Sequence, residues 1–143
     1  MGWILCTVSA QSKNNWEICK ESKLWGISTY GHYGGIPKAK KGDKLLFWVA
    51  SEGYAGVGEV TEDCRPPKGP LEAPWPEGMH RYGLIVPMKL LLDMKTKYWV
   101  PFKNGRQEIT GIAQPVFRRG YKSIPDSQAE IIFEILKKSN KVK

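Results

Sequence analysis

Tryptophans and basic residues are the side chains of this sequence best suited to holding a ligand. The chain has six Trp among 143 residues, which is more than the core of a small domain readily accommodates. We therefore expect some of them to line a site. An aromatic face stacks on any nucleobase, with roughly 1 to 3 kcal/mol per stacked base, and two facing indoles can hold a flipped nucleotide between them.

The charge balance favours a polyanionic partner. Lys and Arg number 22 against 14 Asp and Glu, which leaves a formal net charge of +8. Such an excess attracts polyanions from solution, and nucleic acid is the obvious candidate. Many basic proteins bind no polyanion, however, and the last lysines fit a solvated tail: Lys137, Lys138, Lys141 and Lys143.

The cysteines and histidines predict neither a metal site nor a disulfide framework. The three cysteines are odd in number and widely spaced, and no C-x-x-C pair occurs. His32 and His80 are the only histidines that could join them as ligands. We therefore expect buried, reduced thiols at Cys6, Cys19 and Cys64, and neither a metal nor a cofactor.

These side chains are expected to belong to one domain spanning residues 1–143, because the sequence has no repeat, linker or low-complexity segment. No apolar run approaches the roughly 20 residues of a membrane span. Met1 to Ser9 is too short and too poor in basic residues for a signal peptide. We expect a cytoplasmic protein with no membrane partner.

The first half of the chain predicts a strand, a helix and a β-hairpin. Apolar and aromatic residues indicate the strands, and a serine in N-cap position indicates the helix start. The predicted elements are a strand over Trp3–Val8, a helix over Lys13–Ser22 with Ser12 as its cap, paired strands Lys44–Ala50 and Tyr54–Val60 with Gly53 at the turn, and a long proline-rich loop from Thr61 to His80.

The second half predicts further short strands and a closing helix. Asp126 marks the helix start, and Ser127 and Glu130 have the spacing of a capping box. Together the elements predict an α+β fold, a small barrel of about six strands flanked by roughly two or three helices. The remaining predicted features are strands Tyr82–Leu92 and Tyr98–Phe102, a turn at Asn104-Gly105, short strands around Val116 and Tyr121, and a helical stripe of Ile132, Ile135 and Leu136.

Several short motifs follow one another in a specific order. They are Asn15-Trp16 at a helix start, Lys23-Leu24-Trp25-Gly26 after that helix, Lys41-Gly42-Asp43 leading into the strand Lys44–Phe47, Gly56-Val57-Gly58-Glu59-Val60, and Phe117-Arg118-Arg119-Gly120 before a short strand and the last helix. In order and spacing this combination resembles the EVE domain family over nearly the whole chain.

EVE domains belong with YTH and ASCH domains to the PUA-like superfamily, so the resemblance implies a barrel with a pocket for one base, often a modified one. In the related YTH domains that pocket is an aromatic cage. The matching positions here are Trp25 for one wall, Trp75 for the second wall and Asn15 at the base edge. We expect the other four tryptophans to be mainly core: Trp3, Trp16, Trp48 and Trp99.

Further contacts to a bound nucleotide are expected from residues near these positions. Gly26 and Ser28 can supply contacts to the edge of the base. Tyr30, His32 and Tyr33 belong to a glycine-rich loop that either closes over the base or packs against the domain. Basic residues around the pocket mouth are expected to contact the sugar-phosphate backbone: Arg118, Arg119, Lys38, Lys40 and Lys41.

The resemblance implies a non-catalytic module that recognises a methylated cytosine or adenine flipped into the cage. Modified DNA is the favoured partner, as for the N-terminal readers of McrB-type restriction proteins, and the oligomeric state is open. Alternatives are an RNA-binding PUA-like protein, a protein-interaction adaptor, and an ASCH-like hydrolase of a modified nucleoside. The hydrolase pattern G-x-K-x-x-E-x-R is absent, and so are a Walker loop, a G-x-S-x-G elbow and a zinc-deaminase signature.

Overall fold

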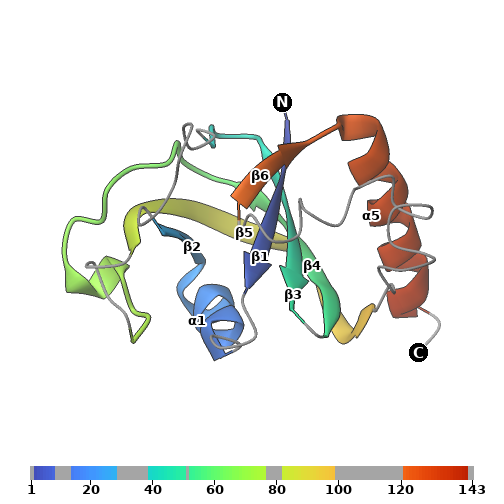
Figure 1. The fold of residues 1–143 in the computed structure, drawn as a ribbon, viewed down its shortest axis with the longest axis horizontal. Helices are drawn as coiled ribbons and strands as arrows, with labels where there is room; N and C mark the ends of the chain where they lie inside the picture. Colours follow the sequence, from blue (N-terminus) through green and yellow to red (C-terminus); the bar gives the residue numbers. More distant parts are fainter. Residues whose placement is uncertain are drawn as a thin grey trace.

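One six-stranded mixed sheet organises the protein (Figure 1). The computed structural model describes residues 2–8, 14–28, 39–50, 52–76, 82–98 and 121–141. The strand order is β2-β5-β4-β3-β1-β6, in which β1 and β3 are parallel and the other neighbours antiparallel. In chain order the elements are β1 (Trp3–Val8), α1 (Asn14–Ser22), β2 (Leu24–Ser28), β3 (Lys44–Val49), β4 (Gly53–Val60), the 3-10 helix η2 (Pro70–Glu72), β5 (Tyr82–Tyr98), β6 (Tyr121–Ile124) and α5 (Asp126–Lys141).

The predicted α+β class with six strands is confirmed, but the sheet is open. β2 pairs with β5 alone and β6 pairs with β1 alone. A barrel closes only when its end strands exchange hydrogen bonds with each other. Because β2 and β6 do not, the described strands form a sheet with two edges rather than the barrel that the sequence predicted.

Several predicted elements are confirmed nearly to the residue. The strand over Trp3–Val8 is β1, the hairpin is β3 and β4, and the closing helix begins at Asp126 as expected. On α5, Ile132 and Leu136 of the predicted stripe are buried, and Ala129 is buried with them. These elements have strong local signals because their apolar patterns agree with the tertiary packing. The predicted capping box is wrong, since α5 begins at Asp126 and Ser127 therefore lies inside its first turn and not at the N-cap position.

Trp25 and Gly26 lie in the strand β2, for which the sequence predicted no element. Lys23 has a positive φ of 60°, and its amide N–H donates to the carbonyl of Cys19 at 2.9 Å. This left-handed residue ends α1 and turns the chain directly into β2. In β2, Trp25 pairs with Val86 of β5.

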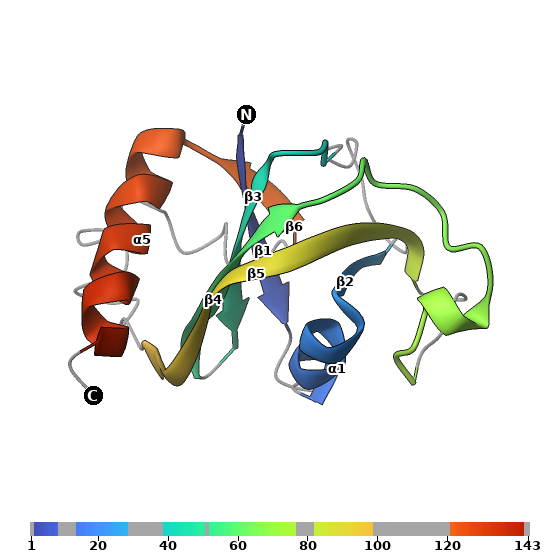
Figure 2. The ribbon, with the colours of Figure 1, turned by 180° about the vertical axis from the view of Figure 1, so that it is seen from behind.

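β5 is one long strand, where the sequence predicted a break after Leu92. It runs from Tyr82 to Tyr98 and curves across the molecule (Figures 1 and 2). Polar residues around Asp93 interrupt the apolar pattern of the sequence, so the second half of β5 was not predicted as part of the same strand. Met94 in this half is buried against α5. Of the other predicted features, residues 99–102, Asn104-Gly105, Val116 and Trp99 lie outside the described residues, and Tyr121 begins β6.

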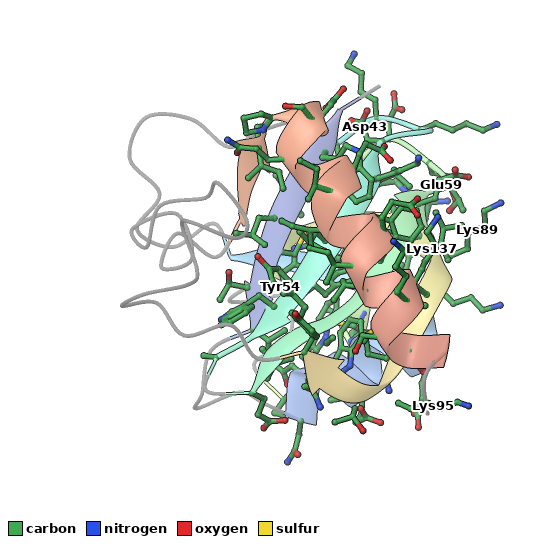
Figure 3. All side chains as sticks on the ribbon, turned by 90° about the vertical axis from the view of Figure 1, so that its right-hand side faces the viewer. Asp43, Tyr54, Glu59, Lys89, Lys95 and Lys137 are labelled. Carbon is green, nitrogen blue, oxygen red and sulfur yellow. The ribbon has the colours of Figure 1, made fainter. Side chains whose placement is uncertain are left out.

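A side chain of α5 completes the backbone hydrogen bonding where β4 and β5 lose register. The paired residues jump from Gly56 with Asp93 to Tyr54 with Tyr98. Within this irregular part, the Lys95 N–H donates to Asn140 Oδ1 at 3.0 Å, and Asn140 Nδ2 donates to the Asp93 carbonyl at 3.5 Å. Lys95 lies next to the C-terminal end of α5 (Figure 3).

Each face of the sheet carries its own core. The first-face core lies under α1 and the segment 61–76, whereas the second-face core lies under α5 (Figures 1 and 2). β1 shows the alternation that divides them, because Ile4 and Cys6 belong to the first-face core and Trp3 and Leu5 to the second. As predicted, Trp3, Trp16 and Trp48 are buried in these cores.

Polar contacts on the second face fix α5 to the sheet. The Trp3 indole N–H donates to Glu130 Oε1 at 3.1 Å, and Lys44 Nζ lies 3.8 Å from the same carboxylate oxygen. Figure 3 shows α5 lying across the strands, with the ion pair of Lys89 and Glu59 (3.4 Å) at the edge of this side. No helix in the described ranges has the length and apolar character needed to cross a membrane.

Candidate functional site

Four aromatic side chains gather in the first-face core, and we call Trp16, Trp25, Phe47 and Trp75 the aromatic cluster. Phe47 of β3 stands between two of the indoles. Its ring centroid is 4.7 Å from that of Trp16 and 5.5 Å from that of Trp25, with interplanar angles of 44° and 53°. These distances are typical of stabilising aromatic pairs. The helix α1 and the strands β2 and β3 therefore each contribute one ring to a contiguous arrangement.

Two glycines of β4 make room for this cluster. A Cβ atom on Gly58 would lie 3.2 Å from Phe47 Cε2 and 3.1 Å from Met88 Sδ. A Cβ atom on Gly56 would lie 2.4 Å from the Leu92 carbonyl oxygen and 3.5 Å from Trp16 Cζ2. The glycine-bearing strand singled out in the sequence thus lets the rings and the backbone of β5 approach β4 closely.

Trp25 combines deep burial with an unsatisfied donor. Only 6% of its surface is exposed, and its indole N–H has no hydrogen-bond partner among the residues that the structure describes. A buried donor left unpaired costs about 1 to 3 kcal/mol, and such groups are rare in folded proteins. The aromatic cluster therefore contains a hydrogen-bond donor that no described residue satisfies.

Trp75 is held by a thiol. Its indole Nε1 donates to Cys19 Sγ at 3.3 Å, and the backbone N–H of Gly26 is a second donor to the same sulfur. Burial raises the pKa of Cys19 to about 12, although both hydrogen bonds act in the opposite direction. Cys19 thus remains a neutral thiol and joins the loop that carries Trp75 to the strand that carries Trp25.

The loop that positions Trp75 is ordered by a charged contact. Arg65 donates from Nη1 and Nη2 to the two carboxylate oxygens of Glu72, both at 2.8 Å, and the Lys68 N–H donates to Glu72 Oε1 at 2.8 Å. These contacts hold the pKa of Glu72 down at about 2, with the Arg65 hydrogen bonds as the largest cause. Arg65 also pairs through its backbone with Ile85 of β5.

The structure brings four of the predicted base-binding residues to the first face of the sheet. Trp25 and Gly26 lie in β2, Asn15 is buried in the first turn of α1, and Trp75 packs in the same core. Trp75 is only 3% exposed. The two predicted cage walls are therefore packed as deeply as the core tryptophans, and a base that stacks on them has to displace part of that packing.

Other predicted positions are only partly described. Ser28 ends β2 and pairs with Tyr82 after a register shift, and its side chain lies outside the described part of the structure. The same holds for every atom of the remaining loop and arginine positions, namely Tyr30, His32, Tyr33, Lys38, Arg118 and Arg119.

Lys40 and Lys41 lie beside the first-face core with exposed side chains. Their backbone is fixed by two carboxylates, because the Lys40 N–H donates to Asp43 Oδ2 at 2.9 Å and the Lys41 N–H to Asp63 Oδ1 at 2.8 Å. The preceding residue, Ala39, is part of the core itself. The backbone of both residues is thus held in an ordered turn, and their contact with a sugar-phosphate backbone stays a prediction.

Sequence reasoning missed Cys19 and Phe47, which occupy central positions in the site. Cys19 was predicted as a buried thiol, which is confirmed, but its bond to Trp75 links residues 56 positions apart. Phe47 belonged to an apolar strand and carried no separate signal. Among the described residues, no group of three or more His, Cys, Asp or Glu side chains is placed to hold a metal ion.

Comparisons with known proteins identify the fold. No protein-family model matches the chain. A UPF0310 protein of Pyrococcus abyssi is 36% identical over 62 residues, a segment that covers 43% of this chain and only 39% of that protein. The YTH domain of the Zygosaccharomyces rouxii MRB1 protein, in complex with N6-methyladenosine RNA, is 17% identical, with a TM-score of 0.58 over 94% of this chain and 86% of its own.

The Toxoplasma CPSF4 YTH domain, in complex with an m6A-modified RNA, is similar to the same degree. It is 13% identical, with a TM-score of 0.60 over 95% of this chain and 91% of its own. A protein from Pseudomonas syringae gives a TM-score of 0.60 at 13% identity over 93% of this chain and 98% of its own. The chain has the fold of a YTH domain. At these identities the likeness concerns the fold alone.

Proposed function

We propose that this protein is a nucleic-acid-binding module that recognises one modified base at the aromatic cluster. The observation that carries the proposal is the buried indole N–H of Trp25, which has no partner within a cluster that also holds Trp75. A ligand that satisfies this donor recovers hydrogen-bond free energy that the unliganded protein forgoes. The N–H of an indole lies in the plane of the ring. Trp25 can therefore stack on a base with its face and donate to an acceptor at its edge.

The base most strongly supported is N6-methyladenine. Two neighbours in fold are YTH domains in complex with RNA that carries this modification. A methyl group adds burial of about 0.8 kcal/mol against the rings, which suits an apolar site. These neighbours favour RNA, whereas the sequence-based preference for DNA has no support of its own, so both nucleic acids belong in the test.

Basic residues on the same side support a polyanionic partner. Lys40 and Lys41 are exposed on an anchored turn next to the first-face core, where they can contact phosphates without competing for the base. We further propose that the chain is an EVE-type domain and that it binds without catalysis. Conversion of a modified nucleoside by the purified protein, followed by chromatography, would contradict the second proposal.

The decisive experiment is fluorescence-anisotropy titration at fixed salt concentration. Matched DNA and RNA oligonucleotides carry adenine, N6-methyladenine, cytosine or 5-methylcytosine at one position. We expect one modified oligonucleotide to bind at least about tenfold more tightly than its unmodified match, which corresponds to 1.4 kcal/mol. Trp25→Ala should abolish this preference, and Trp25→Phe, which keeps an aromatic face without the N–H, should reduce it.

The matched control is Trp48→Phe, because Trp48 is equally buried but belongs to the second-face core. This variant should retain the preference even if it lowers the melting temperature. Lys41→Ala should weaken all oligonucleotides alike and reduce the salt dependence of binding. Equal affinity of the wild-type protein for modified and unmodified ligands would exclude a base reader.

A further inference from the structure

Leu71 is almost completely exposed. In the described part of the chain, 94% of its surface is accessible to solvent, compared with 41% for Leu91 and 56% for Ile131. It occupies the centre of η2, at the outer end of the segment 61–76, which extends away from the sheet on the side of α1 (Figures 1 and 2). The protein therefore presents a large apolar side chain to water at a protruding turn.

The turn that carries Leu71 is preorganised. The carboxylate of Glu72, the next residue, is fixed by Arg65 and by the Lys68 N–H, each at 2.8 Å. Backbone bonds close the turn on both sides of Leu71, from the Glu72 N–H to Gly69 and from the Ala73 N–H to Pro70, each at 3.0 Å. Because the backbone is already ordered, a contact made by Leu71 loses little conformational entropy on binding.

The same turn leads directly into the aromatic cluster. Ala73 and Trp75 are both buried in the first-face core, so the chain passes from full exposure to full burial within a few residues. At no more than about 3.6 Å per residue, the Cα atoms of Leu71 and Trp75 are within roughly 15 Å of each other. Leu71 thus protrudes close to the position at which the proposed function places a flipped base.

We propose that Leu71 is a wedge that enters the base stack of a duplex when the modified base leaves it for the aromatic cluster. The inference rests on the proposed base-reading function. Moving a base out of a duplex breaks its stacking and its pairing, and proteins that distort duplexes insert apolar side chains such as Leu between base steps. A leucine at the gap replaces part of the lost stacking, and the exposed Lys68 on the same turn is available to a neighbouring phosphate.

A wedge matters for a duplex and not for a single strand, because a single strand requires no base pair to be opened. The experiment measures anisotropy with an N6-methyladenine duplex and with the same modified strand alone, in DNA and in RNA. A 2-aminopurine next to the modified base reports unstacking through increased fluorescence. Leu71→Ala is compared with Leu91→Ala, which removes an exposed leucine from β5.

We expect Leu71→Ala to weaken duplex binding about tenfold, to change single-strand binding less than about twofold, and to suppress the 2-aminopurine signal. Leu91→Ala should behave like the wild-type protein. The melting temperature of Leu71→Ala should be unchanged, since the side chain is exposed in the folded protein. Equal effects of Leu71→Ala on duplex and single strand, or no effect on either, would overturn the inference.

The two proposals fail in different ways. If the base-reading function is wrong, the wild-type protein shows no preference for the modified oligonucleotide in either form. If only the wedge is wrong, that preference persists and Trp25→Ala abolishes it, while Leu71→Ala leaves duplex affinity and the 2-aminopurine signal unchanged.

Discussion

The thiol of Cys19 accepts a hydrogen bond from the indole N–H of Trp75, with Nε1 and Sγ 3.3 Å apart. This contact ties the end of a long loop to the helix α1. The same sulfur accepts from the backbone N–H of Gly26, the residue after Trp25 in β2. Cys19 thereby links the segment that carries Trp75 to the strand that carries Trp25.

Removal of this acceptor should destabilise the protein. Cys19→Ala removes the thiol that accepts from the buried N–H of Trp75, which we expect to lower the free energy of unfolding by about 1 to 3 kcal/mol, measured by urea denaturation. Cys6→Ala is the matched control, because Cys6 is also a fully buried thiol and its Sγ donates a long hydrogen bond, 4.0 Å, to the Ile4 carbonyl. Equal losses for the two variants would mean that the cavity, and not the hydrogen bond, determines the effect.

Alkaline pH should destabilise the protein through the buried thiols. Burial raises the pKa of Cys19 from its ordinary 9.0 to about 12 and raises the pKa of Cys6 as well. The unfolded chain therefore loses these protons first. The stability contributed by Cys19 is complete below about pH 9 and falls as the pH rises towards 12, by about 1.4 kcal/mol per pH unit, and Cys6 acts in the same direction.

The Cys19 contribution can be isolated with Cys19→Ser, since serine does not titrate in this range. Free energies of unfolding between pH 9 and pH 11 should fall less steeply in the variant than in the wild-type protein. Identical slopes would show that Cys19 ionises in the folded state, contrary to its burial.

Gly56 should tolerate no larger residue. An added Cβ would lie 2.4 Å from the Leu92 carbonyl oxygen, so Gly56→Ala must push β4 and β5 apart, and we expect a loss of roughly 1 to 3 kcal/mol or more. Thermal unfolding followed by circular dichroism tests this. Gly69→Ala is the control, because a Cβ there meets nothing within 4 Å and the backbone is extended. A melting temperature for Gly56→Ala at the level of Gly69→Ala would refute the close approach of the strands.

The contact of Arg65 with Glu72 should respond to acid. The pKa of Glu72 is lowered from 4.5 to about 2, so the stability that this carboxylate contributes to the folded protein is present above pH 4.5 and is lost as the pH falls through 2.

Hydrogen exchange at the Lys68 amide, which donates to Glu72, should accelerate in Glu72→Gln at neutral pH. Glu62→Gln should leave that amide protected, because Glu62 is an exposed partner 3.7 Å from Arg65. Similar protection in both variants would argue against the proposed ordering of this loop.

The sequence predicted elements well where local pattern and tertiary packing agree. Trp3–Val8 is an apolar run, and Asp126 precedes an apolar stripe of helical period, so β1 and the start of α5 were identified from neighbouring residues alone. β5 was divided in two because charged residues flank the buried Met94. β2 was not predicted, because nothing local shows that Lys23 turns the chain straight from α1 into a strand.

The candidate site was predictable only in part, for a physical reason. Tryptophan content, Asn15 and the Trp25-Gly26 pair marked residues that the structure places together on the first face of the sheet. The depth of burial of Trp25 and Trp75, the role of Cys19 and the unpaired indole N–H depend on contacts between distant segments. Such contacts leave no trace in residue spacing.

The side-chain amide of Asn140 takes the place of a peptide group in a neighbouring strand. Its oxygen accepts from the Lys95 N–H, and its nitrogen donates to the Asp93 carbonyl. Deamidation would convert this residue to a carboxylate that can still accept but can no longer donate, and that faces the Asp93 carbonyl with a negative charge. Such a change would leave the Asp93 carbonyl without the donor that Asn140 Nδ2 provides. The irregular part of β5 is thus held from the side by an amide nitrogen near the C-terminal end of α5.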